Sequence, residues 1–123
     1  MKRKLTVLLA LIALLACVAT ATATAGGLRV IGSGKSSGQF AATAATGSKK
    51  RAHAVYVRGY GRGLSGHASV ACSRGFSIGS KSKSWDVMRS GRLYRVPLPF
   101  VGDCQVVAGL GGSGRIHLQI LAA

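Results

Sequence analysis

Aromatic and arginine side chains alternate along one short run of the sequence, Tyr56-Val-Arg58-Gly-Tyr60-Gly-Arg62. Successive side chains of a β-strand point to opposite faces, so these four groups would project together from one face. Aromatic rings offer stacking surfaces, and guanidinium groups offer forked donors for phosphate or carboxylate. The spacing therefore predicts a surface that binds an anionic polymer or an anionic membrane surface. The alternative interpretation is cross-strand packing, in which the rings and the arginine stems cover the sheet.

A second set of basic side chains follows in the sequence. It comprises Lys81, Lys83, Arg89, Arg92 and Arg95. These residues span an expected loop and the strand after it. They either extend the anion-binding surface or form a solvated charged rim. We count Lys81, Lys83, Arg89 and Arg92 among the candidate binding residues.

Groups that could carry catalysis are few. The histidines are His53, His67 and His117. None has the i, i+4 helical spacing of a zinc site, and each falls on the polar phase of an expected strand. A Ser-His-Asp set would have to draw on Ser65 and on one of the two acidic residues, Asp86 or Asp103. We therefore expect no enzyme, no cofactor and no metal, and a small extracellular hydrolase is the remaining catalytic alternative.

The N-terminal residues have the three parts of a secretory signal peptide. Lys2-Arg-Lys4 is basic, residues 5–16 are almost wholly apolar, and residues 19–25 alternate alanine and threonine with several A-x-A cleavage sites. We predict a signal helix over residues 1–25 and a mature chain that begins at Gly26.

Two alternatives to a cleaved signal remain. Residues 5–25 carry no charge and are about long enough to form an uncleaved membrane anchor. The run Leu14-Leu-Ala-Cys17 resembles a bacterial lipobox, in which acylation of Cys17 would make the protein a lipid-anchored envelope lipoprotein.

Without residues 1–25 the chain has two cysteines, Cys72 and Cys104. An even pair in an exported protein indicates one disulfide. The whole sequence has 17 lysines and arginines, two aspartates and no glutamate, and three of the basic residues lie in the signal. The remaining 14 basic residues and two acidic ones give a net charge of +12. Internal ion pairs cannot neutralise this excess, so we expect an anionic partner.

Apolar and polar residues alternate from residue 55 onward, with glycines about every ten residues. This pattern predicts an all-β antiparallel sandwich of about seven short strands, the last two forming a hairpin around Gly111–Gly114. Cys72 and Cys104 both fall on apolar phases, and Trp85 lies 13 residues after Cys72. We therefore predict an immunoglobulin-like architecture with an inter-sheet disulfide, without membership of that family. Pro97 and its neighbours predict either a sheet edge or a crossover between the two sheets, because proline cannot donate a backbone hydrogen bond to a neighbouring strand.

Three regions follow from these patterns. They are a signal peptide (1–25), a flexible Gly/Ala/Ser-rich segment with at most one edge strand (26–50) and a β-sandwich domain (51–123). The chain is predicted to be a monomeric, exported, strongly basic and non-catalytic binding or structural module for an anionic envelope or extracellular partner. Nucleic acid fits the same side chains, but export favours an envelope polymer. A secreted inhibitor that presents the loop from Arg89 to Arg95 is a further alternative.

Overall fold

The computed structural model describes residues 27–123, so the predicted signal helix over residues 1–25 and the lipid attachment at Cys17 lie outside the described residues. The fold is all-β and antiparallel. Its five strands are β1 (Arg29–Ala52), β2 (Val55–Arg74), β3 (Ser77–Met88), β4 (Leu93–Val96) and β5 (Gly102–Ala122). Within residues 27–123, no helix has the length and apolar character needed to span a membrane.

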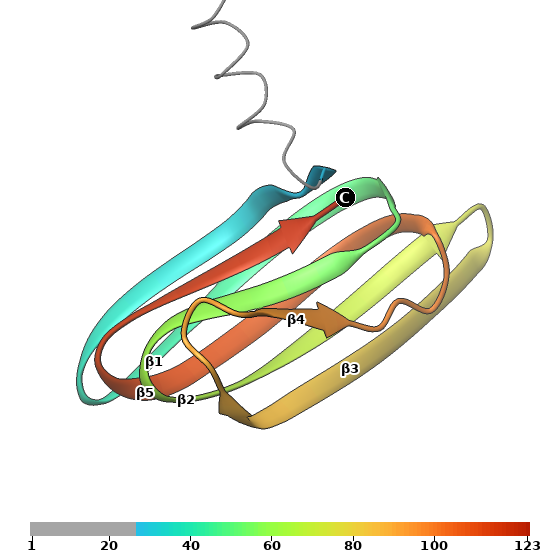
Figure 1. The fold of residues 1–123 in the computed structure, drawn as a ribbon. Helices are drawn as coiled ribbons and strands as arrows, with labels where there is room; N and C mark the ends of the chain where they lie inside the picture. Colours follow the sequence, from blue (N-terminus) through green and yellow to red (C-terminus); the bar gives the residue numbers. More distant parts are fainter. Residues whose placement is uncertain (1–26) are drawn as a thin grey trace, which may run out of the picture.

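The sheet has the order β1-β5-β2-β3, and β4 pairs with the first residues of β2, on the same edge as β3. Figure 1 shows that β1, β5 and β2 each curve back on themselves at the same end of the molecule. The register shifts in β1 between Gly38 and Ala41 and in β2 between Tyr60 and Ser65 fall at this bend. One continuous sheet is therefore folded over into a two-layered, sandwich-like structure.

The first layer contains β4 and one leg each of β1, β5 and β2 (residues 29–38, 115–122 and 55–60). The second layer contains β3 and the other legs (residues 41–52, 102–112 and 64–74). Two bend glycines, Gly61 (φ 141°) and Gly114 (φ 76°), adopt backbone angles that residues with a side chain rarely take. The bend therefore falls where the sequence supplies glycine.

Alternation along each strand explains how the two layers enclose a core. The largest fully buried side chains come from alternate positions of β2, β4 and β5: Val55, Val57, Val70, Cys72, Val96, Cys104, Val106, Leu118 and Ile120. No polar or charged residue is buried in the described part of the chain. Trp85 of β3 and Tyr94 of β4 pack against each other, with ring centroids 5.6 Å apart, and cover the open edge between the layers. The core is thus apolar and sealed by aromatic rings.

The disulfide joins Cys72 and Cys104 as predicted, but the expectation that it links two sheets is wrong. The two cysteines are direct cross-strand partners on β2 and β5 of the second layer, with Cα atoms 4.0 Å apart. Both are buried. Both cysteines lie on the apolar side of their strands, as predicted. Alternation alone does not show whether two inward-facing residues belong to facing layers or to adjacent strands.

The predicted C-terminal hairpin is also wrong. Residues 102–122 form the single strand β5, and its two legs pair with β1 and β2 instead of with each other. In the same way, residues 77–88 form the single strand β3. The structure therefore has four long strands and the four-residue strand β4 instead of about seven short ones, and the immunoglobulin-like architecture is not confirmed. A glycine cluster permits a bend within a strand as well as a reversal between strands.

The segment from residue 26 to residue 50, expected to be flexible with at most one edge strand, lies mostly in β1. This strand pairs with β5 from Arg29 to Ala52 and forms one edge of the sheet. Ala41, Ala45 and Ala52 of β1 are buried in the core. The alanines and glycines of β1 pair through their backbones and allow neighbouring strands to approach closely. A composition typical of a linker therefore belongs to a strand in this protein.

Candidate functional site

The outer face of the first layer carries three of the predicted binding residues. Alternation in β2 turns Val55 and Val57 into the core and leaves Tyr56, Arg58 and Tyr60 on the opposite face. Tyr56 and Arg58 are half-buried, and Tyr60 is exposed. The neighbouring strand β5 places Gln119 beside Arg58 and His117 beside Tyr60.

Arg58 is held in place by two neighbours. Its Nε and Nη2 atoms both donate to the side-chain oxygen of Gln119, at 3.0 and 2.8 Å. Its guanidinium carbon lies 5.6 Å from the centre of the Tyr60 ring, within the range of a cation–π interaction. These contacts fix the rotamer and use one edge of the guanidinium group. The Nη1 donors remain available to a ligand oxygen.

Tyr60 and His117 form the centre of this face. Their rings stack with centroids 5.9 Å apart and an interplanar angle of 30°. Beside them lies an open depression of about 420 Å³, lined by Tyr60, His117, Ile116, Arg115 and Lys35 with Ser36 and Ser37. Lys35 reaches this site because β1 pairs it directly with His117. The depression therefore combines two cations, two aromatic rings and three hydroxyl groups.

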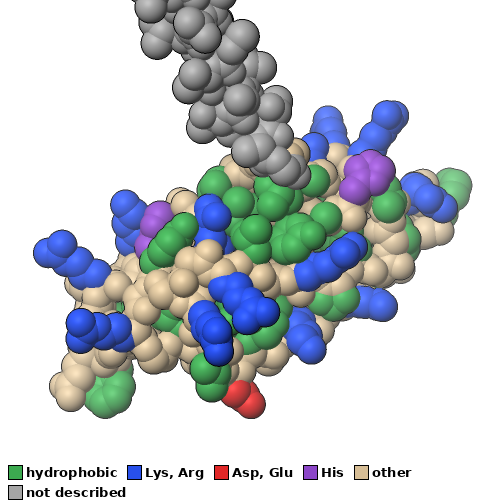
Figure 2. Space-filling view, viewed as in Figure 1, with side chains coloured by type: hydrophobic (Ala, Val, Ile, Leu, Met, Phe, Trp, Pro, Cys, Tyr) green, Lys and Arg blue, Asp and Glu red, His purple; other side chains and the backbone are tan. Residues whose placement is uncertain are grey.

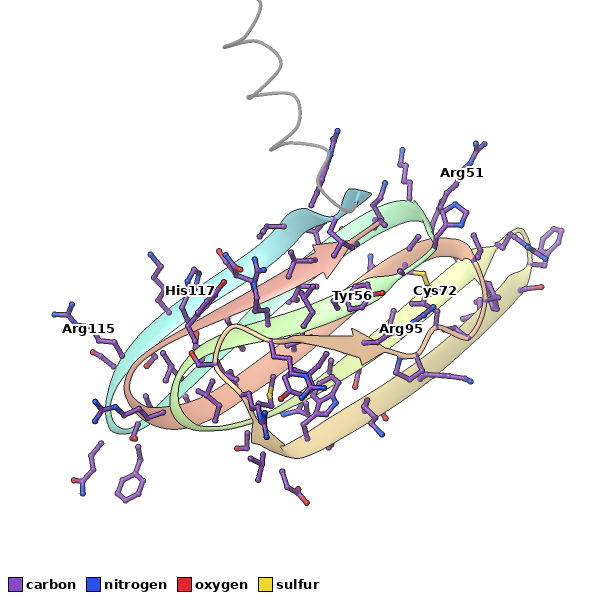
Figure 3. The ribbon with its side chains drawn as sticks, viewed as in Figure 1. Arg51, Tyr56, Cys72, Arg95, Arg115 and His117 are labelled. Carbon is purple, nitrogen blue, oxygen red and sulfur yellow. A yellow bond between two sulfur atoms is a disulfide. The ribbon has the colours of Figure 1, made fainter. Side chains whose placement is uncertain are left out.

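Charge on this face is of one sign. Arg95 of β4 is the cross-strand partner of Tyr56 and extends the cationic surface to the other edge of the layer. Both acidic residues of the sequence, Asp86 and Asp103, belong to strands of the second layer. Figures 2 and 3 show this side of the molecule, with lysine and arginine side chains spread over it and with Tyr56, Arg95, Arg115 and His117 labelled.

We name this surface the basic face. It comprises Lys35, Tyr56, Arg58, Tyr60, Arg95, Arg115, His117 and Gln119.

Other predicted binding residues lie elsewhere. Arg62 sits at the bend, where the register with β5 is shifted, and lines a separate depression with Arg115. Arg89 and Arg92 belong to the turn before β4. The backbone N–H of Arg89 donates to the Tyr94 hydroxyl at 2.7 Å, and the guanidinium carbon of Arg92 lies 5.7 Å from the centre of the Tyr94 ring. The structure therefore does not bring these three residues into the basic face.

Lys81 and Lys83 occupy the edge strand of the second layer. Lys81 pairs with Val70 and Lys83 pairs with Ala68, and the side chains of Val70 and Ala68 point into the core. Both lysines therefore lie on the inner side of the sheet, and their side chains reach solvent at its open edge. Both are exposed. Inward-phase lysines on an edge strand are a device that blocks pairing with another sheet.

Sequence reasoning missed Lys35, Arg115, His117 and Gln119. The last three alternate along the sequence with Ile116, Leu118 and Ile120, and that alternation was visible. The pairing of β5 with β2 could not be predicted from the sequence, because pairing between residues about sixty positions apart leaves no local pattern. Lys35 lies in the Gly/Ala/Ser-rich segment 26–50, whose composition predicts a flexible chain and not a strand.

The structure places the residues that were considered for catalysis or metal binding. Residues 27–123 contain no cluster of three or more His, Cys, Asp or Glu side chains that could hold a metal ion. Ser65, His67 and Asp86 do line one depression of the second layer. The imidazole of His67, however, lies over Gly109 of β5. Its Nε2 atom is 2.9 Å from the position that a Cβ added to Gly109 would occupy. Asp86 is on β3, on the other side of β2, so His67 leans away from it.

The sequence matches no protein-family model and no curated protein. Among solved structures, the fold is similar to a carbohydrate-binding module, TmCBM61, determined in complex with beta-1,4-galactotriose. The similarity has a TM-score of 0.35 and 10% sequence identity, and it covers 78% of this chain and 86% of that chain. At this level of similarity, what this chain binds has to be inferred from its own side chains.

Proposed function

We propose that the protein is a non-catalytic binding module that holds an anionic polymer on the basic face. The observation that carries the proposal is the fixed position of Arg58, which is bonded to Gln119 and lies against Tyr60 on a face without acidic residues. A guanidinium group already held in one rotamer loses little entropy when it binds a carboxylate, sulfate or phosphate.

The extent of the basic face favours a polymer over a single small ion. Its cations lie on all four strands of the first layer, from Lys35 on β1 to Arg95 on β4. Adjacent strands are about 4.8 Å apart, so these side chains cross the whole width of the layer. The depression beside Tyr60 and His117 would hold one charged unit of such a chain, and Arg58 and Arg95 would contact the units that follow.

We further propose that the protein acts outside the cytoplasm, in the cell envelope or in the extracellular medium. Two features support this location. Residues 1–25 have the sequence pattern of a signal peptide, and the disulfide between Cys72 and Cys104 is of a kind that persists in oxidising compartments.

Heparin, a sulfated polysaccharide, provides the test. The double variant Lys35→Gln/Arg115→Gln removes two charges from the basic face. The matched control Lys81→Gln/Lys83→Gln removes two exposed charges from the edge of the second layer. We expect the first variant to weaken binding about tenfold or more, and the control to weaken it only about twofold, because salt screens long-range attraction much more strongly than it screens direct contacts.

Isothermal titration at near-physiological ionic strength measures both affinities. Circular dichroism and the intact disulfide show that each variant has folded. Equal losses for the two double variants would mean that heparin responds only to net charge, and the proposal of a specific binding face would then be rejected.

A further inference from the structure

The end of the molecule opposite the bend carries an exposed apolar tip. β2 and β3 are joined there by a tight turn at Gly75 and Phe76, and we call residues 74–78 the hairpin tip. Phe76 has a relative exposure of 106%, as high as in an extended chain, and Ile78 has 83%. Gly75 takes a φ of 62°, which a two-residue hairpin turn favours at its first position. The turn therefore holds a phenyl ring in solvent without contacts that would hide it.

Cations surround the hairpin tip. Arg51 and Arg74 line a depression of about 540 Å³ together with His53, Asp103 and Val101, which is 40% exposed. Lys49 and Lys50 line the neighbouring depression beside Ile78. The lysines and arginines come from the end of β1 and the end of β2, which the sheet brings to one end of the molecule.

Arg51 is positioned by an unusual backbone contact. Its φ is 51°, and its backbone N–H donates to a carboxylate oxygen of Asp103 at 3.1 Å. The one acid near the hairpin tip therefore binds the backbone of Arg51, and Figure 3 shows the Arg51 side chain pointing away from the sandwich. The guanidinium group is left to an external anion.

From this arrangement we infer that the hairpin tip docks on an anionic lipid surface. Phe76 and Ile78 enter the interface between headgroups and acyl chains, and Arg51, Arg74 and Lys50 bind lipid phosphates. The hairpin tip is convex, so the protein itself does not form a pocket around the phenyl ring of Phe76. The ring can therefore be buried only in a medium that encloses it. A bilayer interface provides that medium and places negative charge beside it. This second surface is separate from the basic face, and the inference does not depend on the proposed function.

A tryptophan at the tip reports on docking in the full chain. The sequence contains one tryptophan, Trp85, so the background Trp85→Phe allows a new tryptophan to be the only one. We expect Phe76→Trp in this background to show a blue shift and protection from acrylamide with phosphatidylglycerol vesicles, and neither effect with phosphatidylcholine vesicles. The matched control is Phe40→Trp, which replaces a phenylalanine that is 91% exposed in β1 at the bend. Its emission should stay unshifted.

The contribution of charge is tested in the same Phe76→Trp background. Arg51→Gln/Arg74→Gln should raise the lipid concentration at half-maximal blue shift about twenty-fivefold, because each basic residue near an anionic surface contributes about fivefold. Arg89→Gln/Arg92→Gln removes the same charge from the turn before β4 and should raise it about twofold or less.

The inference would be overturned by an unshifted Phe76→Trp emission with anionic vesicles, by an equal shift for Phe40→Trp, or by equal effects of the two double variants. A Phe76→Ser variant separates the two surfaces, because it should bind heparin like the wild type. If Phe76→Ser lost heparin binding while its circular dichroism and disulfide stayed intact, the tip would belong to a protein or polymer site instead of a lipid site.

Discussion

Gln119 is the residue on which the orientation of Arg58 depends. Two hydrogen bonds to one oxygen hold the guanidinium group, and the pair lies half-buried between β2 and β5. We predict that Gln119→Ala, which leaves the net charge unchanged, weakens heparin binding about threefold to tenfold, because Arg58 would then lose rotamer entropy on binding. Titration calorimetry at fixed salt should show the loss as a less favourable binding entropy.

Gln105 provides a matched control for this prediction. It lies on the same strand but on the outer face of the second layer, and it is exposed. Gln105→Ala should leave heparin binding unchanged. If Gln119→Ala bound heparin with wild-type affinity, Arg58 would be acting as a mobile charge. The fixed position of Arg58 would then no longer support the proposed function.

The residues of the basic face differ in how far the sequence could predict them. Tyr56, Arg58 and Tyr60 were found because alternation within one strand is a local property. His117 and Lys35 join them only through cross-strand pairing, which depends on strands far apart in the sequence. Sequence patterns therefore gave the part of the site contributed by β2 and could not give the parts contributed by β5 and β1.

At the scale of elements, β3 shows how an edge strand can be protected from association. Lys81 and Lys83 lie on the inner phase, where apolar residues would otherwise extend the core to the edge of the sheet. We predict that Lys81→Val/Lys83→Val leaves the protein folded but causes concentration-dependent association, because β-branched residues replace the charges that oppose edge-to-edge pairing. Dynamic light scattering over a range of concentrations measures the effect.

Ser82→Val/Ser84→Val is the control for the edge. These serines belong to the same strand but to its outer phase, so they add similar apolar surface without removing an inward charge. We expect this variant to associate much less than the lysine variant. If both associate equally, exposed apolar area alone drives the assembly, and the lysines have no special role as edge residues.

The lengths of the strands were the least predictable feature of the elements. The strand character of β2, β4 and most of β5 follows from alternation. The prolines after β4 lie where the chain passes from the first layer to the second, but these layers belong to one folded sheet and not to the two sheets expected. Gly111 and its neighbours were read as a reversal. Glycine permits both a turn and a sharp bend in one strand, and only the identity of the pairing partners decides between them.

At the scale of the whole molecule, folding one sheet over places two different surfaces back to back. The outer face of the first layer is basic and aromatic. The outer face of the second layer presents mainly small residues, such as Ala44, Ser65, Ser69 and Gly109. Each long strand contributes to both layers, so the basic face and the disulfide are parts of one cooperative unit. Loss of contact between the layers should therefore destabilise both.

Gly34 tests this coupling at the edge where the two legs of β1 face each other. A Cβ at Gly34 would overlap the backbone oxygen of Ala44 and would stand 2.6 Å from Oγ1 of Thr43. We predict that Gly34→Ala lowers the free energy of unfolding by about 2–3 kcal/mol, because the layers must separate locally to make room.

Gly111→Ala is the control, since the atom nearest to the added Cβ, Oγ of Ser65, would be 3.6 Å away, which is an ordinary contact. Its cost should be at most about 0.5 kcal/mol. Urea denaturation monitored by Trp85 fluorescence measures both, and equal stability of the two variants would contradict the close approach of the two legs of β1.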